Sequence, residues 1–449
     1  MTVQKSIEAN MDSIVGPTHF YAGLAYGNLA AMKHQGVISS PKKAALEGLN
    51  KMKTCMDLGV LQLVLPPLER PKISFLHNLG FFGSEEQCLK QAYESNKKLL
   101  FAAYSASSMW MANSATMTPL FDSQNQKSYI SVANLSTHVH RSIESEDMYY
   151  LLQNIFKNSG IEVLNPLHYS FSDEGAANHV RLCYQHHQEG IHLFVYGSNR
   201  LDYRSDMFDK YPQRQSLEAS QAIARRHCLK KENLIFAKQS KDSVQKGAFH
   251  ADLLILSHQY VFICHEKTFQ DQSDVLQKIR KKFRQLSQII PIIIEIKDQE
   301  LSLEEAIASY FFNSQIVSLS NGDWVLLAPS QCQENTRVLR VIQGILAAKN
   351  PIKNVIYVPV NQSMFNGGGP ACLRLRLVCS LKEWNGIHHG VKFSNTLYHQ
   401  LCQWVCTYYP DVLTEKQLLC ARFLRQCRDA LHELSNILGL YPLYSFQKK

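Results

Sequence analysis

The sequence predicts a mixed α/β fold, and three observations support this class. Segments with a helical spacing of apolar residues alternate with short apolar segments along the whole chain. Hairpin signals between the short segments require antiparallel strand pairs, which argues against an all-parallel doubly wound sheet. No linker or change of composition divides the chain. A single domain over residues 1–449 is therefore expected, because a closed repetitive architecture can hold a chain of this length as one unit.

The helical segments carry recognisable start signals. Ser40 followed by Pro41 is typical of a helix N-terminus, and apolar residues then recur at helical spacing up to Gly59. A second helix is expected over residues 216–229. About the last fifty residues are also expected to be helical.

Strands are expected in short apolar segments bounded by polar residues. These segments are residues 191–196, 253–256, 260–264, 289–294 and 354–358. The second and third are separated by a short polar break, which predicts a hairpin. Asn321-Gly322 between residues 316–319 and 324–327 is a strong hairpin signal, because this pair adopts the tight turn that matches strand twist. No sequence repeat is evident by eye.

Composition excludes several classes of protein. The chain is 45% hydrophobic and 19% charged, and it contains no apolar run of about 18 residues, so no membrane span is expected. The N-terminus lacks the pattern of a signal peptide, and the 12 cysteines form no CxxC pair. These features predict a cytoplasmic protein with reduced thiols.

The formal net charge of +9 includes basic runs such as residues 278–282, which predict a solvated helix face. No aromatic residues interleave with these runs, so no nucleic-acid partner is expected. A mildly positive chain also favours anionic small substrates.

One cysteine lies where a nucleophile is expected. In residues 366–376, three glycines and Pro370 lead directly into an alternating strand pattern, with Cys372 at its start. Consecutive glycines allow turns closed to other residues and a close approach to a ligand, and proline fixes one dihedral angle. A buried structural cysteine does not need such a loop, whereas a cysteine that must reach a substrate carbon does. Cys372 is therefore the candidate nucleophile.

Three other segments contain acid–base groups or backbone donors. Residues 173–179 place two acids beside small residues, which indicates either a carboxylate with room beside it or a surface turn with capping acids. Residues 247–252 place a histidine and an aspartate at a strand entrance, and a core histidine is the alternative. Residues 22–28 form a glycine-containing loop that could offer N–H groups to an anion, or could simply connect elements.

A cysteine, a histidine and a carboxylate are compatible with two kinds of reaction. The thiolate is the nucleophile, and the histidine transfers protons. In acyl transfer the carboxylate only orients the histidine, whereas a guanidinium substrate requires a carboxylate whose two oxygens match its paired N–H groups. The residues alone leave both reactions open.

A metal site is not expected. His399, Cys402 and Cys406 share one face of an expected helix, but the packing of small apolar side chains explains this face better than metal ligands do. The prediction is therefore that the protein uses neither a metal nor another cofactor.

Short blocks of sequence, in order along the whole chain, carry a family resemblance. They are residues 8–12, 15–19, 21–24, 65–71, 109–113, 140–144, 173–179, 194–197 and 366–376. On these blocks the chain resembles the N-succinylarginine dihydrolases of the guanidino-group-modifying (pentein) superfamily. The resemblance implies a five-bladed, pseudo-symmetric α/β propeller, in which blades of roughly 90 residues leave room for helices. It also implies a homodimer.

The resemblance assigns roles to individual residues. Cys372 matches the family nucleophile, and His250 and Glu174 match the other two catalytic residues. The positions that match substrate contacts are Ala22, Gly23, Leu24, Ala25, Tyr26, Gly27, Asn28, Leu29, Ala30, Ala31, Asn113, His140, Arg141, Arg214, Asp252 and Asn366. The chain departs from the family at Ala251, where asparagine is usual, and at Leu120-Phe121, where small polar residues are common.

The implied reaction converts N2-succinyl-L-arginine and two waters to N2-succinyl-L-ornithine, two ammonia and carbon dioxide, in arginine catabolism by the succinyltransferase route. Glu174 and Asp252 are expected to hold the guanidinium group while Cys372 attacks its carbon and His250 moves protons. One alternative is a deiminase that stops after one round on arginine or another guanidine. A non-catalytic binder is a second alternative, against which the intact catalytic positions argue.

Four arginines have different expected roles. Arg141 and Arg214, together with the N–H groups of residues 22–28, are expected to anchor the substrate carboxylates. Arg374 and Arg376 share strand parity with Cys372. They are expected to pair with structural acids, because two more cations would repel a cationic substrate.

Overall fold

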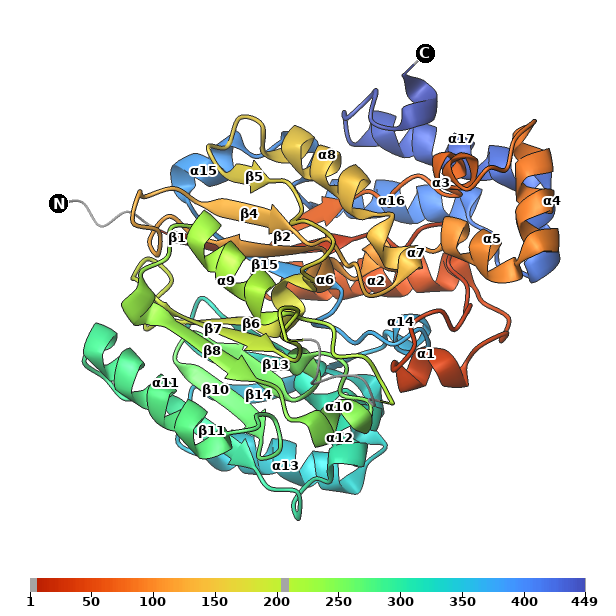
Figure 1. Ribbon diagram of the computed structural model, residues 1–449. Coiled ribbons are helices and arrows are strands. Elements are labelled where there is room, and N and C mark those ends of the chain that lie inside the picture. The colour runs from red at the N-terminus through yellow and green to blue at the C-terminus, as the bar shows by residue number, and fades with distance from the viewer. Residues whose placement is uncertain (1–5, 203–209, 449) are drawn as a thin grey trace.

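The computed structural model describes residues 6–202 and 210–448, and this part of the chain forms five three-stranded sheets arranged around an axis (Figure 1). The sheets, with their strands in spatial order, are β15 (Arg374–Ser380), β1 (Ser6–Ser13) and β2 (Leu61–Leu65); β3 (Ala115–Thr118), β4 (Tyr129–Val132) and β5 (Glu162–Leu164); β6 (His179–Leu182), β7 (Ile191–Tyr196) and β8 (Leu234–Lys238); β9 (Ile255–His258), β10 (Val261–His265) and β11 (Ile292–Ile296); and β12 (Gln315–Ser318), β13 (Trp324–Pro329) and β14 (Ile352–Val358).

All five sheets share one topology. In each, the first two strands pair antiparallel and the last two pair parallel. A helix lies in the connection between each parallel pair, as a parallel crossover requires. These helices are α2 (Pro41–Asp57), α8 (Ser145–Phe156), α9 (Leu217–Arg226), α11 (Gln272–Ser287) and α13 (Thr336–Ala347). The expected five-bladed α/β propeller is thus confirmed. The blades repeat the same order of secondary-structure elements, not the same amino-acid sequence.

The first blade joins the two ends of the chain. β1 pairs antiparallel with β15, so that Met11 faces Leu375 and Glu8 faces Val378. Both Met11 and Leu375 belong to the largest group of buried apolar side chains. The ring is therefore closed by hydrogen bonds between a strand near the N-terminus and one that immediately follows the predicted nucleophile.

The remaining helices lie in other connections and on one flank, and the short α6 is fully buried. They are α1 (Leu29–Lys33), α3 (Ile73–Asn78), α4 (Glu85–Ser95), α5 (Lys97–Tyr104), α6 (Met111–Ser114), α7 (Val139–Ser142), α10 (Lys241–Gln245), α12 (Leu303–Ser309), α14 (Asn361–Phe365), α15 (Leu381–Gly386), α16 (Asn395–Tyr408) and α17 (Ala421–Ile437). On the flank, Leu89 of α4 and Leu100 of α5 pack with Leu424 of α17 (Figure 1). Across the described ranges, no helix has the length and apolar character to cross a bilayer.

Most predicted elements are confirmed. Ser40 caps α2 by accepting a hydrogen bond from the Lys43 N–H, and Ser216 caps α9 in the same way. The helical C-terminal region is confirmed by α16 and α17, and strand β7 has the predicted bounds. Both predicted hairpins are also present, because β9 pairs antiparallel with β10 and β12 with β13.

Two predicted strands begin later than expected. Leu253 ends a 3-10 turn, Ala251–Leu253, so strand β9 starts only at Ile255. In residues 289–294, the strand starts at Ile292 and is half-buried rather than buried. Gln288 ends α11 in the left-handed conformation, and β11 pairs only with β10, so one edge of β11 has no strand beside it. Before β9, a 3-10 turn occupies a residue that the apolar pattern assigned to the strand, whereas before β11 the apolar residues 289–291 belong to the connection that follows α11.

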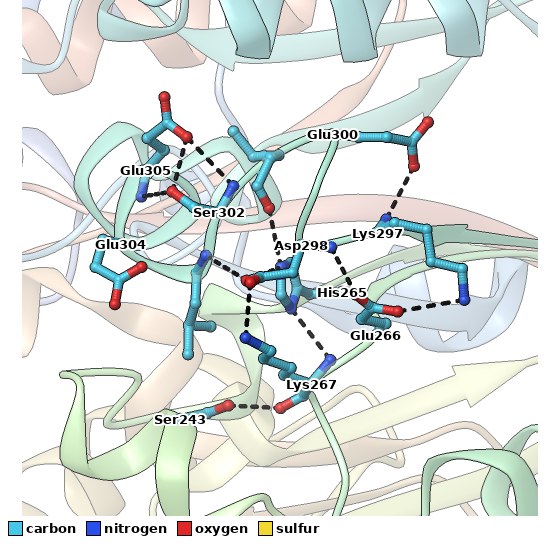
Figure 2. Close-up of polar contacts among 12 residues, drawn as sticks. Ser243, His265, Glu266, Lys267, Lys297, Asp298, Glu300, Ser302, Glu304 and Glu305 are labelled. Atoms are coloured by element: carbon cyan, nitrogen blue, oxygen red, sulfur yellow. Dashed lines mark hydrogen bonds and ion pairs between the residues drawn. The ribbon is translucent and has the colours of Figure 1, made fainter.

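A polar network fixes the connection that leads from β11 toward the centre of the molecule (Figure 2). Lys267 forms an ion pair with Asp298 at 2.7 Å, and the buried His265 donates through Nε2 to the Leu301 carbonyl at 3.0 Å. Ser302 then caps α12, and Glu305 completes the capping box. The 3-10 turn Phe311–Asn313 that follows α12 contacts strand β9 and the 3-10 turn Ala251–Leu253.

Candidate active site

The loop that carries Cys372 follows the backbone path expected from its glycines. A Cβ atom on Gly368 would lie 2.2 Å from Trp110 Nε1, so no larger residue fits there. Cys372 is only 2% exposed and lies two residues before β15. Its carbonyl accepts a hydrogen bond from the Ala112 N–H at 3.1 Å. The prediction that a glycine-rich loop delivers this cysteine to the start of a strand is confirmed.

Two side chains contact the sulfur of Cys372. Asn313 donates through Nδ2 to Cys372 Sγ at 3.1 Å and to Asp252 Oδ2 at 2.9 Å. The thiol of Cys372 in turn donates to Asp252 Oδ2 at 3.4 Å. The second oxygen, Oδ1 of Asp252, is buried and has no hydrogen-bond partner among the described residues. The nucleophile candidate therefore lies beside a carboxylate with one oxygen available.

Glu174 is bound on both oxygens. Arg141 Nη1 and His250 Nε2 donate to Oε2 at 2.5 and 2.8 Å, and Thr137 donates to Oε1 at 2.7 Å. A carboxylate only accepts, so the proton of neutral His250 is on Nε2. The other ring nitrogen, Nδ1, then carries the lone pair, and it is buried without a partner in the described structure. His250 thus presents a free basic nitrogen.

The ionisation of this pair follows from burial and charge. Burial alone would raise the pKa of Glu174, but Arg141 and His250 hold the pKa of this carboxyl well below its usual range. Burial lowers the pKa of His250 to about 4, against the opposing effect of Glu174. At neutral pH the pair is therefore a carboxylate and a neutral imidazole.

For Asp252 and Cys372, the surroundings favour the protonated, neutral forms. Burial raises the pKa of Asp252 to about 7, although its hydrogen bonds with Cys372 and Asn313 lower it. Burial, and then the charge of Asp252, raise the pKa of the Cys372 thiol well above its usual value. A buried site of this kind favours a cation, which would stabilise both ionised forms.

The loop of residues 22–31 lies over this centre and touches several other segments. Asn28 caps α1 and donates through Nδ2 to the Gly367 carbonyl at 3.2 Å. The Tyr26 carbonyl accepts from Arg214 at 3.2 Å and from His138 Nε2 at 3.3 Å. The loop therefore joins the nucleophile loop to the cationic side of the site.

Of the other predicted substrate contacts, Arg214, Asn113 and His140 are buried and Asn366 is half-buried. Arg214 is 3% exposed, stacks on Phe249 at 4.5 Å, and has its pKa lowered to about 9 by burial. Asn113 is buried, with Oδ1 unpaired among the described residues. His140 is also buried, and burial holds its pKa well below the usual range. Asn366 is half-buried, 3.5 Å from His19 Nε2.

The structure tests the expected pairing of Arg374 and Arg376 with acids and the expected role of Arg141 as an anchor for a substrate carboxylate. Arg376 forms an ion pair with Glu8 at 2.9 Å, so the expected pairing with a structural acid is confirmed for Arg376. Arg374 forms no ion pair with an acid among the described residues, and its Nε is buried without a hydrogen-bond partner there. Arg374 and Arg376 line an axial cavity of about 130 Å³ behind Asp252, together with Arg181. Arg141 lies against Glu174 instead of standing free for an anion. Its atom Nη2 is buried without a hydrogen-bond partner in the described ranges.

The sequence did not indicate every residue that shapes the site. Asn313, Thr137 and Gln215, which accepts from the Glu174 N–H at 2.7 Å, were not predicted. Asn313 follows two phenylalanines, and no motif marks it. These residues act through contacts with partners far away in the chain, which single-sequence patterns do not reveal.

Possible metal ligands gather away from the site. Within residues 6–202 and 210–448, one group of three such side chains has ligand atoms within 4.8 Å of one another: Glu8, His186 and His258. Both oxygens of Glu8 already have partners, since His186 lies 3.0 Å from Oε2 and Arg376 lies 2.9 Å from Oε1. An adjacent guanidinium opposes a bound cation, so an ion-pair network explains this group. His399 and Cys406 are exposed on α16, so the expected packing of that face is wrong.

The fold and the site define a class of protein. Five ββαβ blades around an axis, closed by the pairing of β1 with β15, form the α/β propeller of the pentein fold. A buried cysteine, histidine and carboxylates lie where the blades meet.

Comparison with known proteins identifies the family. The profile of the succinylarginine dihydrolase family matches residues 5–447. The chain is 40% identical over 447 residues to an N-succinylarginine dihydrolase of Shewanella putrefaciens, covering 99% of this chain and 100% of that protein. It is 42% identical over 449 residues to one from Legionella pneumophila, covering 98% and 99%. The chain therefore belongs to the succinylarginine dihydrolase family.

Solved structures with a similar fold are more distant. The N-terminal domain of ArgZ, a cyanobacterial arginine dihydrolase, is 12% identical with a TM-score of 0.48, covering 82% of this chain and 97% of that one. A dimethylarginine dimethylaminohydrolase is 13% identical with a TM-score of 0.43, covering 83% and 100%. The family assignment rests on the sequence matches alone.

Proposed function

We propose that this chain hydrolyses N2-succinyl-L-arginine with two waters to N2-succinyl-L-ornithine, two ammonia and carbon dioxide, as a step of arginine catabolism by the succinyltransferase route. The observation that carries the proposal is the match, over 98–99% of the chain, to relatives named N-succinylarginine dihydrolase. Cys372, His250 and Glu174 are the proposed catalytic residues. The geometry of the site supports each step.

Asp252 is proposed to hold the guanidinium group. Its free Oδ1 is buried beside Cys372 and can accept an N–H of the substrate. The bound cation then stabilises both the Asp252 carboxylate and the Cys372 thiolate. A direct contact of Glu174 with the substrate remains a prediction, since both its oxygens have protein partners here.

Cys372 attacks the guanidinium carbon, and His250 moves the protons. In the first round the thiol proton of Cys372 passes to His250 Nδ1 as the sulfur forms a bond to the carbon, and the C–N bond then breaks as ammonia leaves with that proton. Water then adds to the same carbon while His250 Nδ1 accepts its proton, and the C–S bond breaks to give a ureido product. Glu174 orients the imidazole and stabilises its protonated form.

The second round repeats the attack on the ureido carbon. A second ammonia leaves, and the second water gives a carbamate that breaks down to carbon dioxide and the free amine. This requires that the neutral intermediate stay bound after the guanidinium charge is lost. Arg214 and the N–H groups of residues 22–28 are the proposed anchors for the substrate carboxylates, because Arg214 has its Nε free of partners among the described residues.

The alternative activity is a deiminase that acts once on arginine or another guanidine. It would use the same nucleophile and the same carboxylates, so the centre of the site does not exclude it. The difference lies in the succinyl group, whose recognition is what holds the substrate for a second round.

The stoichiometry of ammonia tests the proposal. Purified protein is given N2-succinylarginine or arginine, and ammonia and remaining substrate are measured together. Two ammonia per N2-succinylarginine consumed, and at least about 100-fold lower kcat/KM for arginine, are expected, because a missing anchor weakens transition-state binding. The Cys372→Ser variant should show no turnover. One ammonia per substrate, or a preference for arginine, would establish the deiminase instead.

The cellular setting is also proposed. A cytoplasmic homodimer fits a metabolic enzyme of this family, and light scattering on the purified protein should give twice the 51.2 kDa chain mass. A monomeric mass at micromolar concentration would contradict the dimer.

A further inference from the structure

Asn313 lies at the point where the nucleophile, the carboxylate and the nucleophile loop meet. It is fully buried at the end of the 3-10 turn Phe311–Asn313. Its carbonyl accepts from the Ala371 N–H at 2.9 Å, and its side-chain Oδ1 accepts from the Cys372 N–H at 3.0 Å. One residue thus satisfies two consecutive backbone donors of the loop that delivers Cys372.

The contacts of Asn313 determine which way its amide points. The Cys372 N–H is only a donor, so the amide oxygen must face it. The amide nitrogen then faces Cys372 Sγ at 3.1 Å and Asp252 Oδ2 at 2.9 Å. A flipped amide would place its oxygen against the carboxylate and its N–H group against another N–H, so it would be repelled at both ends.

The backbone near Asn313 is also unusual, both before the turn and in the nucleophile loop. Tyr310, immediately before the turn, has φ +55°, a conformation that an aromatic residue rarely adopts. On the other side, a Cβ on Gly369 would lie 2.8 Å from Asn313 Oδ1. A strained residue and a glycine together let the amide reach the sulfur, and such strain persists only where the surroundings over-determine it.

We propose that Asn313 is the positioning residue of the nucleophile: its amide donates one N–H to Cys372 Sγ, favouring the thiolate, and the other to Asp252 Oδ2, leaving Oδ1 for the guanidinium group. The inference rests on the proposed role of Cys372 as the nucleophile. Asn313 itself needs no contact with the substrate. Its effect is to hold sulfur and carboxylate in one arrangement through both rounds of attack.

Alkylation of Cys372 in the free enzyme tests this role without any substrate. The rate of modification by iodoacetamide is measured from pH 7 to 11, and midpoints are compared from the rising part of each profile, because burial raises the pKa of the Cys372 thiol well above its usual value. The Cys372 peptide is quantified by mass spectrometry. In Asn313→Ala and Asn313→Asp the midpoint of the rate profile should move up by about one to two pH units, the effect of losing a hydrogen bond to a charged group. The kcat/KM on N2-succinylarginine should fall about 10- to 100-fold.

Asn350→Ala is the matched control. Asn350 is also buried, donates to the Ile345 carbonyl at 2.6 Å and accepts from the Ile352 N–H at 2.7 Å, but it lies before β14, outside the site. Its loss should leave the midpoint unchanged, even if stability falls. An unchanged midpoint in folded Asn313→Ala would overturn the proposal. Failure of Cys372 to react in the wild-type protein would instead count against the proposed nucleophile.

Discussion

Glu174 is fully buried and Asp252 is half-buried, and their surroundings drive their ionisation in opposite directions. Glu174 faces Arg141 and donors from His250 and Thr137, so it stays a carboxylate. Asp252 faces a thiol and an amide, and burial raises its pKa to about 7. The negative charge of Glu174 is neutralised by Arg141. The charge of Asp252 is expected to be neutralised by the cationic substrate.

The pH dependence of activity should follow Asp252. Because its pKa is raised to about 7, the group is protonated at lower pH and cannot hold a cation. We therefore expect kcat/KM to rise as the pH increases through about 7. The Asp252→Asn variant should lose this activity by about 100-fold or more, since a neutral amide does not balance a buried guanidinium. Initial rates from pH 5.5 to 9 check this, and a flat wild-type profile between pH 5.5 and 8 would contradict it.

At the scale of structural elements, the nucleophile loop and the loop of residues 22–31 meet at Gly367. Gly367 has φ +97°, and a Cβ there would lie 1.8 Å from Nδ2 of Asn28, which caps α1. The nucleophile loop and the loop of residues 22–31 can therefore touch only while this position is glycine. Local sequence signals showed that each loop was unusual, but not that they contact each other.

Substitution of Gly367 should distinguish the effect of backbone strain on stability from the effect of the loop contact on substrate binding. Gly367→Ala and the control Gly322→Ala both place alanine at positive φ, +97° and +90°, which costs about 1–2 kcal/mol of stability in each. An alanine Cβ at Gly322, in the β12–β13 turn, meets no described atom within 4 Å. Only Gly367→Ala should also raise the KM for N2-succinylarginine, because it displaces Asn28. Equal kinetics in the two variants would show that the loop contact has no role in binding.

The prediction of elements succeeded where the signal is local. Ser40-Pro41, Ser216 and Asn321-Gly322 were assigned correctly because caps and tight turns depend on a few adjacent residues. The start of β9 was wrong because a 3-10 turn takes the apolar Leu253, and the start of β11 was wrong because the apolar residues 289–291 form a connection that includes Pro291, which has no N–H for the sheet. Of the site, the loop around Cys372 was visible in the residues, whereas His250 and Glu174 were assigned roles only through the family resemblance.

At the scale of the whole molecule, ring closure links the stability of all blades. β1 pairs with β15, and its Met11 is fully buried in the largest apolar group. The single domain expected from the sequence remains a prediction, and it has a thermodynamic consequence. A ring that is closed by the pairing of β1 with β15 should unfold as a whole rather than blade by blade.

Calorimetry can test this cooperativity. The wild-type protein should show one unfolding transition, and Met11→Ala should move the whole transition to lower temperature, with a loss of about 2–5 kcal/mol from the buried cavity. Ile38→Ala is the control, because Ile38 is 64% exposed and its loss should have little effect. Two separable transitions, of which only one moves in Met11→Ala, would show that the chain contains independent folding units.

The sequence by itself determined the mixed α/β class, the helix starts, the hairpins and the glycine-rich approach to Cys372, because each depends on neighbouring residues. Only the tertiary structure decided that Arg141 balances Glu174, that Asp252 keeps one oxygen free, and that Asn313 holds the sulfur from 59 residues away. Such pairings depend on burial and on the meeting of distant segments, and both arise only when five blades close into a ring.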